Sequence, residues 1–72
     1  DAEVLEFMVK PHSAVPKKLV KEVNISKKAV FGGVIRDGVA HMTTGDFQIE
    51  AGDKAVVFCL PEAIHKVEKL FN

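Results

Sequence analysis

The segment from residue 29 to residue 58 constrains the fold more than any other part of the chain. It begins with an apolar run, Ala29–Arg36, whose two alternating faces both carry hydrophobic side chains, so this strand must be covered on both sides. Asp37 and Gly38 follow, and this pair is typical of a tight hairpin turn because both residues tolerate a positive φ. Val39–Met42 is predicted to return as the next strand. The pattern indicates a small sheet with one charged residue held at a strand end.

Alternation within the first of these strands predicts which side chains share a face. Phe31 and Ile35 would lie on one face, and Val30 and Val34 on the other. The two glycines at 32–33 interrupt the strand. They fit close approach of a ligand or a second subunit, but they equally fit a bulge or tight packing against the last helix.

Patterns outside this hairpin predict two more strands and two helices. Residues 3–9 alternate with period two, and residues 54–60 form another apolar strand. Pro16 suits the first position of a short helix at about 15–22, with Lys17, Lys18 and Lys21 facing outward. In the connection 43–53, Phe47 and Ile49 are expected to turn inward, and Gly52 to take a positive φ.

Pro61 and Glu62 open a closing helix, because proline and an acid both favour the first turn. The apolar stripe of this helix is Ile64, Val67, Leu70 and Phe71, and His65 lies on its polar side. The predicted order is therefore β-α-β-β-β-α, a small α+β domain with a largely antiparallel sheet.

Length and composition bound the function. A chain of 72 residues makes one domain and buries only about 60% of its unfolded surface, so its own core is marginal. A single cysteine closes no internal disulfide, and association with a second copy is the expected support. Ten basic and ten acidic side chains cancel, which disfavours nucleic acid as a partner. No apolar run approaches the roughly twenty residues that insertion into a membrane requires.

No group of residues in the sequence predicts catalysis or a metal centre. His12, His41 and His65 fall on a loop, a strand and a helix, with no second ligand at helical spacing, so they are interpreted as ordinary surface histidines. Cys59 lies inside an apolar strand and is expected to behave as a small hydrophobic residue. Glu50 and Asp53 are interpreted as turn formers rather than as metal ligands. We therefore expect no catalytic residues and no metal.

The chain resembles the C-terminal domain of TrkA-type proteins, also called the C-terminal RCK domain (regulator of conductance of K+). The segments that carry the resemblance are EVLEFMV, HSAVPKKL, GGVIRDG, IEAGD, KAVVFCL and PEAIHKVEKLF, which together span nearly all of residues 1–72. Two segments depart from the family pattern. Val15-Pro16 stands where a Gly-Lys pair is frequent, and HMTTGDF stands where an Ile-Pro segment is frequent.

The resemblance implies a regulatory domain, residues 1–72, that is a fragment of a longer cytoplasmic protein at the inner face of the membrane. It implies a homodimer that controls a membrane potassium transporter subunit of the Trk/Ktr type. It also implies an absent N-terminal domain that binds NAD or ATP, with no cofactor in this fragment. The alternative host is an anion or carboxylate transporter, or a cation/proton antiporter, carrying the same domain.

Arg36 is the strongest candidate for binding an effector. Some relatives bind cyclic di-AMP between two C-terminal domains, and a guanidinium offers paired donors to a phosphate. The alternative is a solvated arginine paired with Asp37 or Glu50. The other residues expected around such a site are Gly33, Val34, Ile35, Asp37 and His41.

Overall fold

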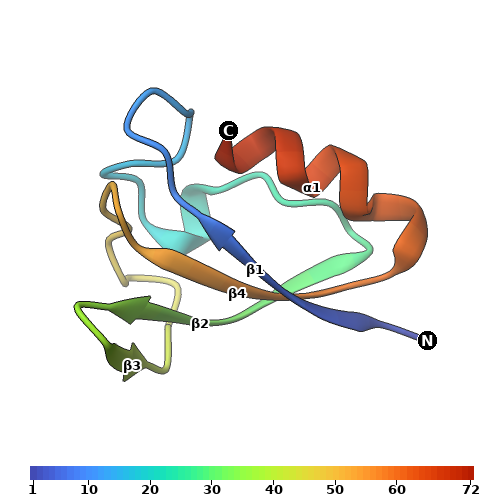
Figure 1. Cartoon of the computed structure of the whole chain (residues 1–72), viewed down its shortest axis with the longest axis horizontal. Coiled ribbons are helices and arrows are strands. Elements are labelled where there is room, and N and C mark those ends of the chain that lie inside the picture. The colour runs from blue at the N-terminus through green and yellow to red at the C-terminus, as the bar shows by residue number, and fades with distance from the viewer.

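The computed structural model describes all 72 residues, with a four-stranded antiparallel sheet and one helix packed across one of its faces (Figure 1). The elements in chain order are β1 (Glu3–Met8), η1 (Val20–Glu22), β2 (Ala29–Arg36), β3 (Val39–His41), β4 (Lys54–Cys59), η2 (Pro61–Ala63) and α1 (Ile64–Phe71). The strand order is β1-β4-β2-β3, and all neighbours are antiparallel. The predicted α+β class and antiparallel sheet are confirmed. β2 has the predicted bounds, and the other three strands end one residue earlier than predicted.

The helix predicted at about 15–22 is wrong. Only a single 3-10 turn, η1, forms there; Lys17 has φ 70°, and Leu19 is extended. The cause is tertiary pairing with the connection between β3 and β4. Four backbone N–H···O bonds join the two segments: Lys17 to Ile49 (2.6 Å), Ile49 to Lys18 (2.8 Å), Val20 to Phe47 (2.9 Å) and Lys21 to Gly45 (2.9 Å). These bonds use backbone groups that a helix would need for itself, so long-range pairing overrides local helical spacing.

A β-bulge in β2 changes the predicted facing of its side chains. The pairing register between β2 and β4 shifts between Phe31 and Gly33. Directly paired residues share a face of the sheet, so Phe31 and Val34 lie on the inner face with Val57 and Ala55. Val30 and Ile35 then lie on the outer face, and the alternation predicted from sequence is wrong beyond the glycines. The bulge interpretation of the glycine pair is confirmed, whereas packing of this pair against the closing helix is wrong.

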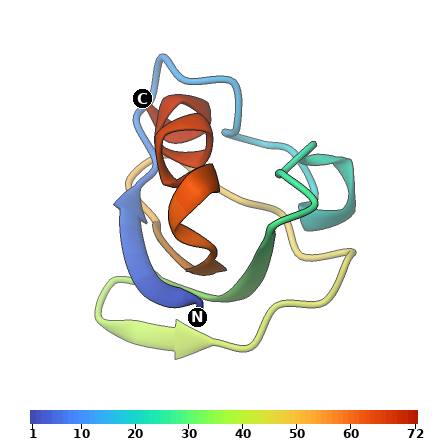
Figure 2. The same ribbon diagram turned by 90° about the vertical axis from the view of Figure 1, so that its right-hand side faces the viewer.

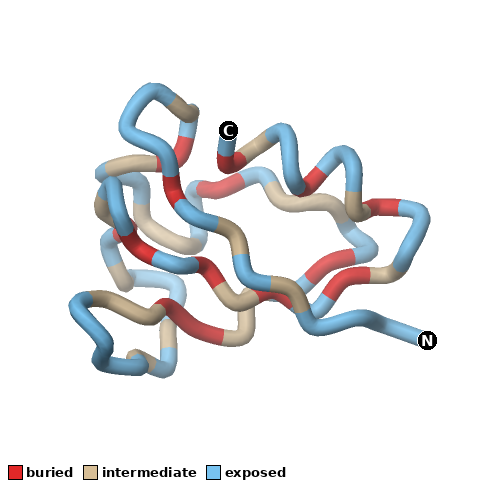
Figure 3. Tube along the Cα trace, viewed as in Figure 1, coloured by how far each residue is buried: buried red, intermediate tan, exposed pale blue.

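The inner face of the sheet and α1 enclose the hydrophobic core, as the end-on view in Figure 2 shows. Phe71 of α1 is 1% exposed and its ring stacks on Phe7 of β1 at 5.3 Å between centroids. Phe31 of β2 meets the same ring edge-on at 6.0 Å. Figure 3 shows the buried residues along the strands and on the sheet side of the helix. The predicted stripe of α1 is confirmed, with Val67 and Phe71 buried and Ile64 and Leu70 packed against the core.

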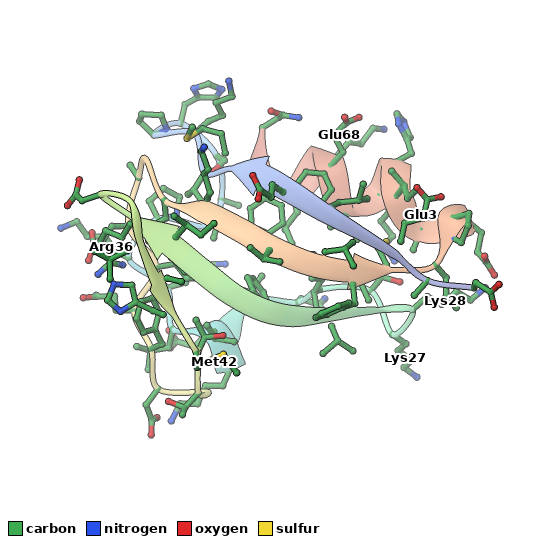
Figure 4. The ribbon with its side chains drawn as sticks, turned by 60° about the horizontal axis from the view of Figure 1, so that its bottom comes forward. Glu3, Lys27, Lys28, Arg36, Met42 and Glu68 are labelled. Carbon is green, nitrogen blue, oxygen red and sulfur yellow. The ribbon has the colours of Figure 1, made fainter.

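The outer face of the sheet has no helix over it and remains apolar (Figure 4). We call this surface the open face. It consists of the exposed Val4, Met8, Val30 and Phe58 together with the half-buried Ile35 and Val56. Val4 and Val30 are 61% and 63% exposed, and both pair with Phe58, which lies between them on β4. The expectation that the strands are apolar on both faces is met, but this chain covers only one of those faces.

Replacing Gly33 with alanine is expected to destabilise the domain by about 2 kcal/mol, because the new methyl group would overpack a rigid site. A Cβ at this position would lie 2.8 Å from the carbonyl oxygen of His41, and the β2–β3 ladder holds that oxygen in place. Urea denaturation measures the loss. Gly32→Ala is the control: its Cβ would meet the ring of Phe58, which is 45% exposed and free to turn away, so a smaller loss is expected. Equal losses in the two variants would contradict this description of the bulge.

Candidate functional site

Arg36, the last residue of β2, is held by an ion pair with Asp53, the residue directly before β4. Its Nε donates to Asp53 Oδ1 at 2.8 Å and its Nη2 donates to Asp53 Oδ2 at 2.7 Å. Nη2 also donates to the backbone carbonyl of Gln48 at 2.9 Å. This two-point geometry is the strong form of an arginine–carboxylate pair. The predicted pairing of Arg36 with Asp37 or Glu50 is wrong, and the guanidinium is not simply solvated.

Asp53 connects three parts of the fold. Its side chain is 2% exposed, and its Oδ2 also accepts the backbone N–H of Glu50 at 2.9 Å, which closes the turn that contains Gly52. Its own carbonyl accepts the N–H of Val9 at 2.8 Å, just beyond β1. The interpretation of Asp53 as a turn former is confirmed, but the carboxylate also binds the end of β2. Gly52 has the predicted positive φ, at 89°.

The pKa of Asp53 reflects opposed effects. Burial by itself raises the pKa of this carboxyl, since removal from water disfavours the charged form. The hydrogen bonds from Arg36 and from the Glu50 N–H, with the positive charge of Arg36, outweigh burial and hold the pKa below its ordinary value. The carboxyl is therefore ionised at neutral pH, and the ion pair with Arg36 is intact there.

An aromatic side chain completes the surroundings of Arg36. Phe47, from the connection between β3 and β4, lies with its ring centroid 5.0 Å from the guanidinium carbon. The ring of His41, from β3, lies 5.6 Å from the ring of Phe47, measured between centroids. A cation over a ring face adds about 0.5–1 kcal/mol at an exposed site. Phe47 therefore helps to attach the connection to the hairpin, and its predicted inward orientation is confirmed by its partial burial.

The six residues predicted to bind an effector do not line one pocket. Val34, Arg36 and His41 belong to the inner side of the sheet, where Val34 is 1% exposed and so closed to a ligand. Gly33 and Ile35 lie on the open face instead. Asp37 is exposed in the hairpin turn with φ 51°. The one guanidinium nitrogen of Arg36 without a hydrogen bond is Nη1.

Sequence reasoning missed the roles of Gln48 and Phe47 beside Arg36, and it assigned Asp53 to the turn alone. The signal that was available is the position of Asp53 directly before an apolar strand, since an acid there is buried only if a cation pairs with it.

The other reactive residues of the chain are isolated. Cys59 is fully buried, as predicted, and burial raises the pKa of its thiol, which makes it a poor nucleophile. His12, His41 and His65 lie on different elements, and no three histidine, cysteine or acidic side chains are arranged to hold a metal ion. Of the helices in the chain, none has the length and apolar character that would let it cross a bilayer.

Known proteins that are similar to this chain point to one family. Residues 4–72 match the family described as the TrkA-C domain. The chain is 31% identical over 71 residues to "Trk system potassium uptake protein TrkA homolog 2" of Methanosarcina mazei, covering 99% of this chain. It is 30% identical over 70 residues to "Trk system potassium uptake protein TrkA" of Azorhizobium caulinodans, covering 97% of this chain. The chain spans only 16% and 15% of the length of these two relatives.

A solved structure supports the fold. The one named "Structure of RCK domain with cda" superimposes with a TM-score of 0.84 and covers 96% of this chain and 97% of its own. The two sequences are 16% identical, so the likeness concerns the fold alone. The family resemblance drawn from the sequence segments is thereby confirmed by an independent match to the family and by the arrangement of the strands.

Proposed function

The chain belongs to the TrkA-C domain family, whose members are regulatory rather than enzymatic and are associated with potassium uptake systems, and from this premise we propose a dimerising switch. In this proposal the domain serves a cytoplasmic subunit that controls potassium uptake through a membrane transporter of the Trk type. The observation that carries the proposal is the open face, because a regulatory domain acts through the surfaces that it offers to other chains.

The open face has the character of a self-pairing surface. A contiguous exposed apolar patch on a small protein marks an interaction site. Four large side chains of the open face are between 45% and 63% exposed. Two charged side chains point to the same side of the sheet, Glu6 on β1 and Lys54 on β4. They have opposite signs and do not pair with each other within the chain. In a dimer with a two-fold axis, Glu6 of each copy would face Lys54 of the other copy. The open face would then be complementary to itself.

The test of dimerisation uses two valines of similar exposure. Val30→Lys puts a charge into the centre of the open face, whereas Val39→Lys puts it on the hairpin, where Val39 is 56% exposed. We expect sedimentation equilibrium to show a dimer for the wild-type chain and for Val39→Lys. Val30→Lys should raise the dissociation constant about a hundredfold or more, the equivalent of roughly 2.7 kcal/mol. A wild-type chain that is monomeric at high micromolar concentration would exclude the proposal.

Regulation would follow from a population shift: a ligand that prefers one arrangement of the dimer changes the geometry transmitted to the transporter. The effector that we propose is cyclic di-AMP. We interpret the abbreviation cda in the name of the similar structure as this nucleotide. Arg36 would offer its free Nη1 to a phosphate without leaving Asp53. Asp37 and His41 flank it on the hairpin, Ile35 would lie at the seam between copies, and the buried Gly33 and Val34 would only shape the strand.

Calorimetric titration with cyclic di-AMP tests this effector separately from dimerisation. His41→Ala is the informative variant, since its ring is half-buried beside Phe47 and contributes little to the core. We expect binding to the wild-type dimer and weaker binding to His41→Ala, with the dimer retained. A wild-type dimer that binds no cyclic di-AMP would remove the effector and leave a purely architectural role.

A further inference from the structure

The one groove in the surface lies on the helix side of the sheet, opposite to the open face. Three segments enclose it: the loop at residues 12–14, the loop at residues 24–26 and the C-terminal half of α1. The first loop stands beside the C-terminal end of α1 in Figure 1, and both loops lie beside the helix in Figure 2. The hollow is shallow and measures about 390 Å³, near the lower end of the range for small-molecule sites.

The charged side chains of the groove are all basic. Lys66 and Lys69 are three residues apart on α1, which places both ammonium groups on neighbouring parts of one helix face. Neither lysine forms an ion pair within the chain. His12 adds a third basic group, and no aspartate or glutamate is among the ten lining residues. Glu68 stands between the two lysines in sequence but does not line the groove.

Hydrogen-bond donors in the groove are free for a ligand. The side-chain amide of Asn24 bonds to no other group of the chain, and the hydroxyl of Ser26 accepts the N–H of Lys28 at 3.1 Å, which leaves its hydrogen to donate. Carbonyl oxygens at the end of a helix repel anions. Here two of them are occupied: the oxygen of Phe71 accepts the N–H of Lys10 at 3.2 Å, and that of Glu68 accepts the amide of Asn72 at 3.0 Å.

We propose that this groove binds a small phosphate-bearing ligand. Lys66 and Lys69 would contact its phosphate oxygens as point charges, and Asn24 and Ser26 would donate hydrogen bonds to the same group. The site goes beyond the proposed switch, because it involves neither Arg36 nor the open face, and both copies of a dimer formed through the open face would keep it accessible. The phosphate could be carried by a soluble nucleotide or by the headgroup of an anionic lipid, and the experiment separates these sources.

The experiment follows backbone amide shifts of the labelled 72-residue chain during titration with AMP, and follows cosedimentation with phosphatidylglycerol vesicles. We expect saturable shifts at residues 12–14, 24–26 and 66–72 with AMP if the ligand is soluble, or cosedimentation without AMP binding if it is a lipid headgroup. The double variant Lys66→Gln with Lys69→Gln should weaken whichever binding occurs at least about tenfold, the equivalent of losing one good charge contact.

The matched control removes two exposed lysines that do not line the groove, Lys18→Gln with Lys27→Gln, and keeps the same net charge as the test variant. It should bind as the wild type does. The proposal is overturned if neither AMP nor vesicles bind at millimolar ligand, if the shifted amides lie elsewhere, or if the control loses as much affinity as the groove variant. Both variants change only surface side chains, and thermal melting verifies that they are folded.

Discussion

Arg36→Ala is expected to lower the free energy of unfolding by about 2–3 kcal/mol at pH 7. The substitution leaves the carboxylate of Asp53, which is 2% exposed, without the cation that offsets its burial. Removing one partner of a fully buried ion pair costs about 3–5 kcal/mol, and we reduce this figure because the side chain of Arg36 is 32% exposed. Urea denaturation measures the loss, in the Val30→Lys background so that dissociation of a dimer does not contribute.

Lys28→Ala is the matched control for this prediction. It also removes a cation from an acidic partner, Glu62, but that pair is 3.4 Å apart and both side chains are more than half exposed. We expect a loss below about 0.5 kcal/mol. Adding Asp53→Asn to Arg36→Ala should restore part of the stability, because a neutral amide is less costly to bury than an unpaired carboxylate. If the Arg36 and Lys28 variants lost equal stability, Arg36–Asp53 would be an ordinary surface pair.

The contribution of Asp53 to the free energy of unfolding should depend on pH with opposite signs in the wild type and in Arg36→Ala. In the wild type the pKa of Asp53 is lowered, so its stabilisation is complete above the unfolded pKa of about 3.9 and is lost as pH falls through the folded pKa. In Arg36→Ala, burial remains as the largest effect on this carboxyl and is opposed mainly by the Glu50 N–H, so we expect the folded pKa to rise above the unfolded one. The variant should therefore gain stability from Asp53 as pH falls from 7 to about 4. The difference between the two unfolding free energies should narrow over that range.

Local signals explain why most of the fold could be predicted from the sequence. Asp37 and Gly38 have φ values of 51° and 77°, as the hairpin signal requires, and β2 begins and ends where the apolar run does. The closing helix follows its apolar stripe. The segment at 15–22 has an equally helical pattern, yet it pairs with residues 45–49. That pairing spans about thirty residues of chain, and no window of helical length contains both partners.

In the candidate site, too, local sequence patterns predict a residue's position but not its distant partner. The place of Arg36 at a strand end identifies it as a candidate, but its partner Asp53 lies seventeen residues further on, where the local pattern indicates only a turn. The bulge at Gly32 then moves Ile35 to the face opposite to Phe31, with which the alternation groups it. A one-residue slip reverses every later side chain of a strand, and nothing in the pattern of Ala29–Arg36 indicates on which side of the glycines the slip occurs.

Phe71→Ala is expected to destabilise the domain even more than the loss of Arg36. Its ring is 1% exposed and contacts both Phe7 and Phe31, so it joins α1 to an edge strand and a central strand of the sheet. Truncating a buried phenylalanine costs about 3–5 kcal/mol, because burial is lost and a cavity is left. A core of this size rarely supplies more than about that amount. We expect the variant to be largely unfolded at 25 °C, with loss of amide dispersion in its NMR spectrum.

Phe58→Ala removes the same atoms from the opposite face of the sheet, which makes it a test of where the core ends. Phe58 is 45% exposed in the isolated chain and packs over Gly32, so its truncation should cost the folded monomer about 1 kcal/mol or less. The dimer should lose more, because this ring lies between Val4 and Val30 at the centre of the open face. A folded Phe58→Ala chain with weakened association would assign the inner face to folding and the outer face to assembly. If both Phe71→Ala and Phe58→Ala unfolded, the outer face would instead be part of one continuous core. The open face would then no longer be expected to bind a second copy.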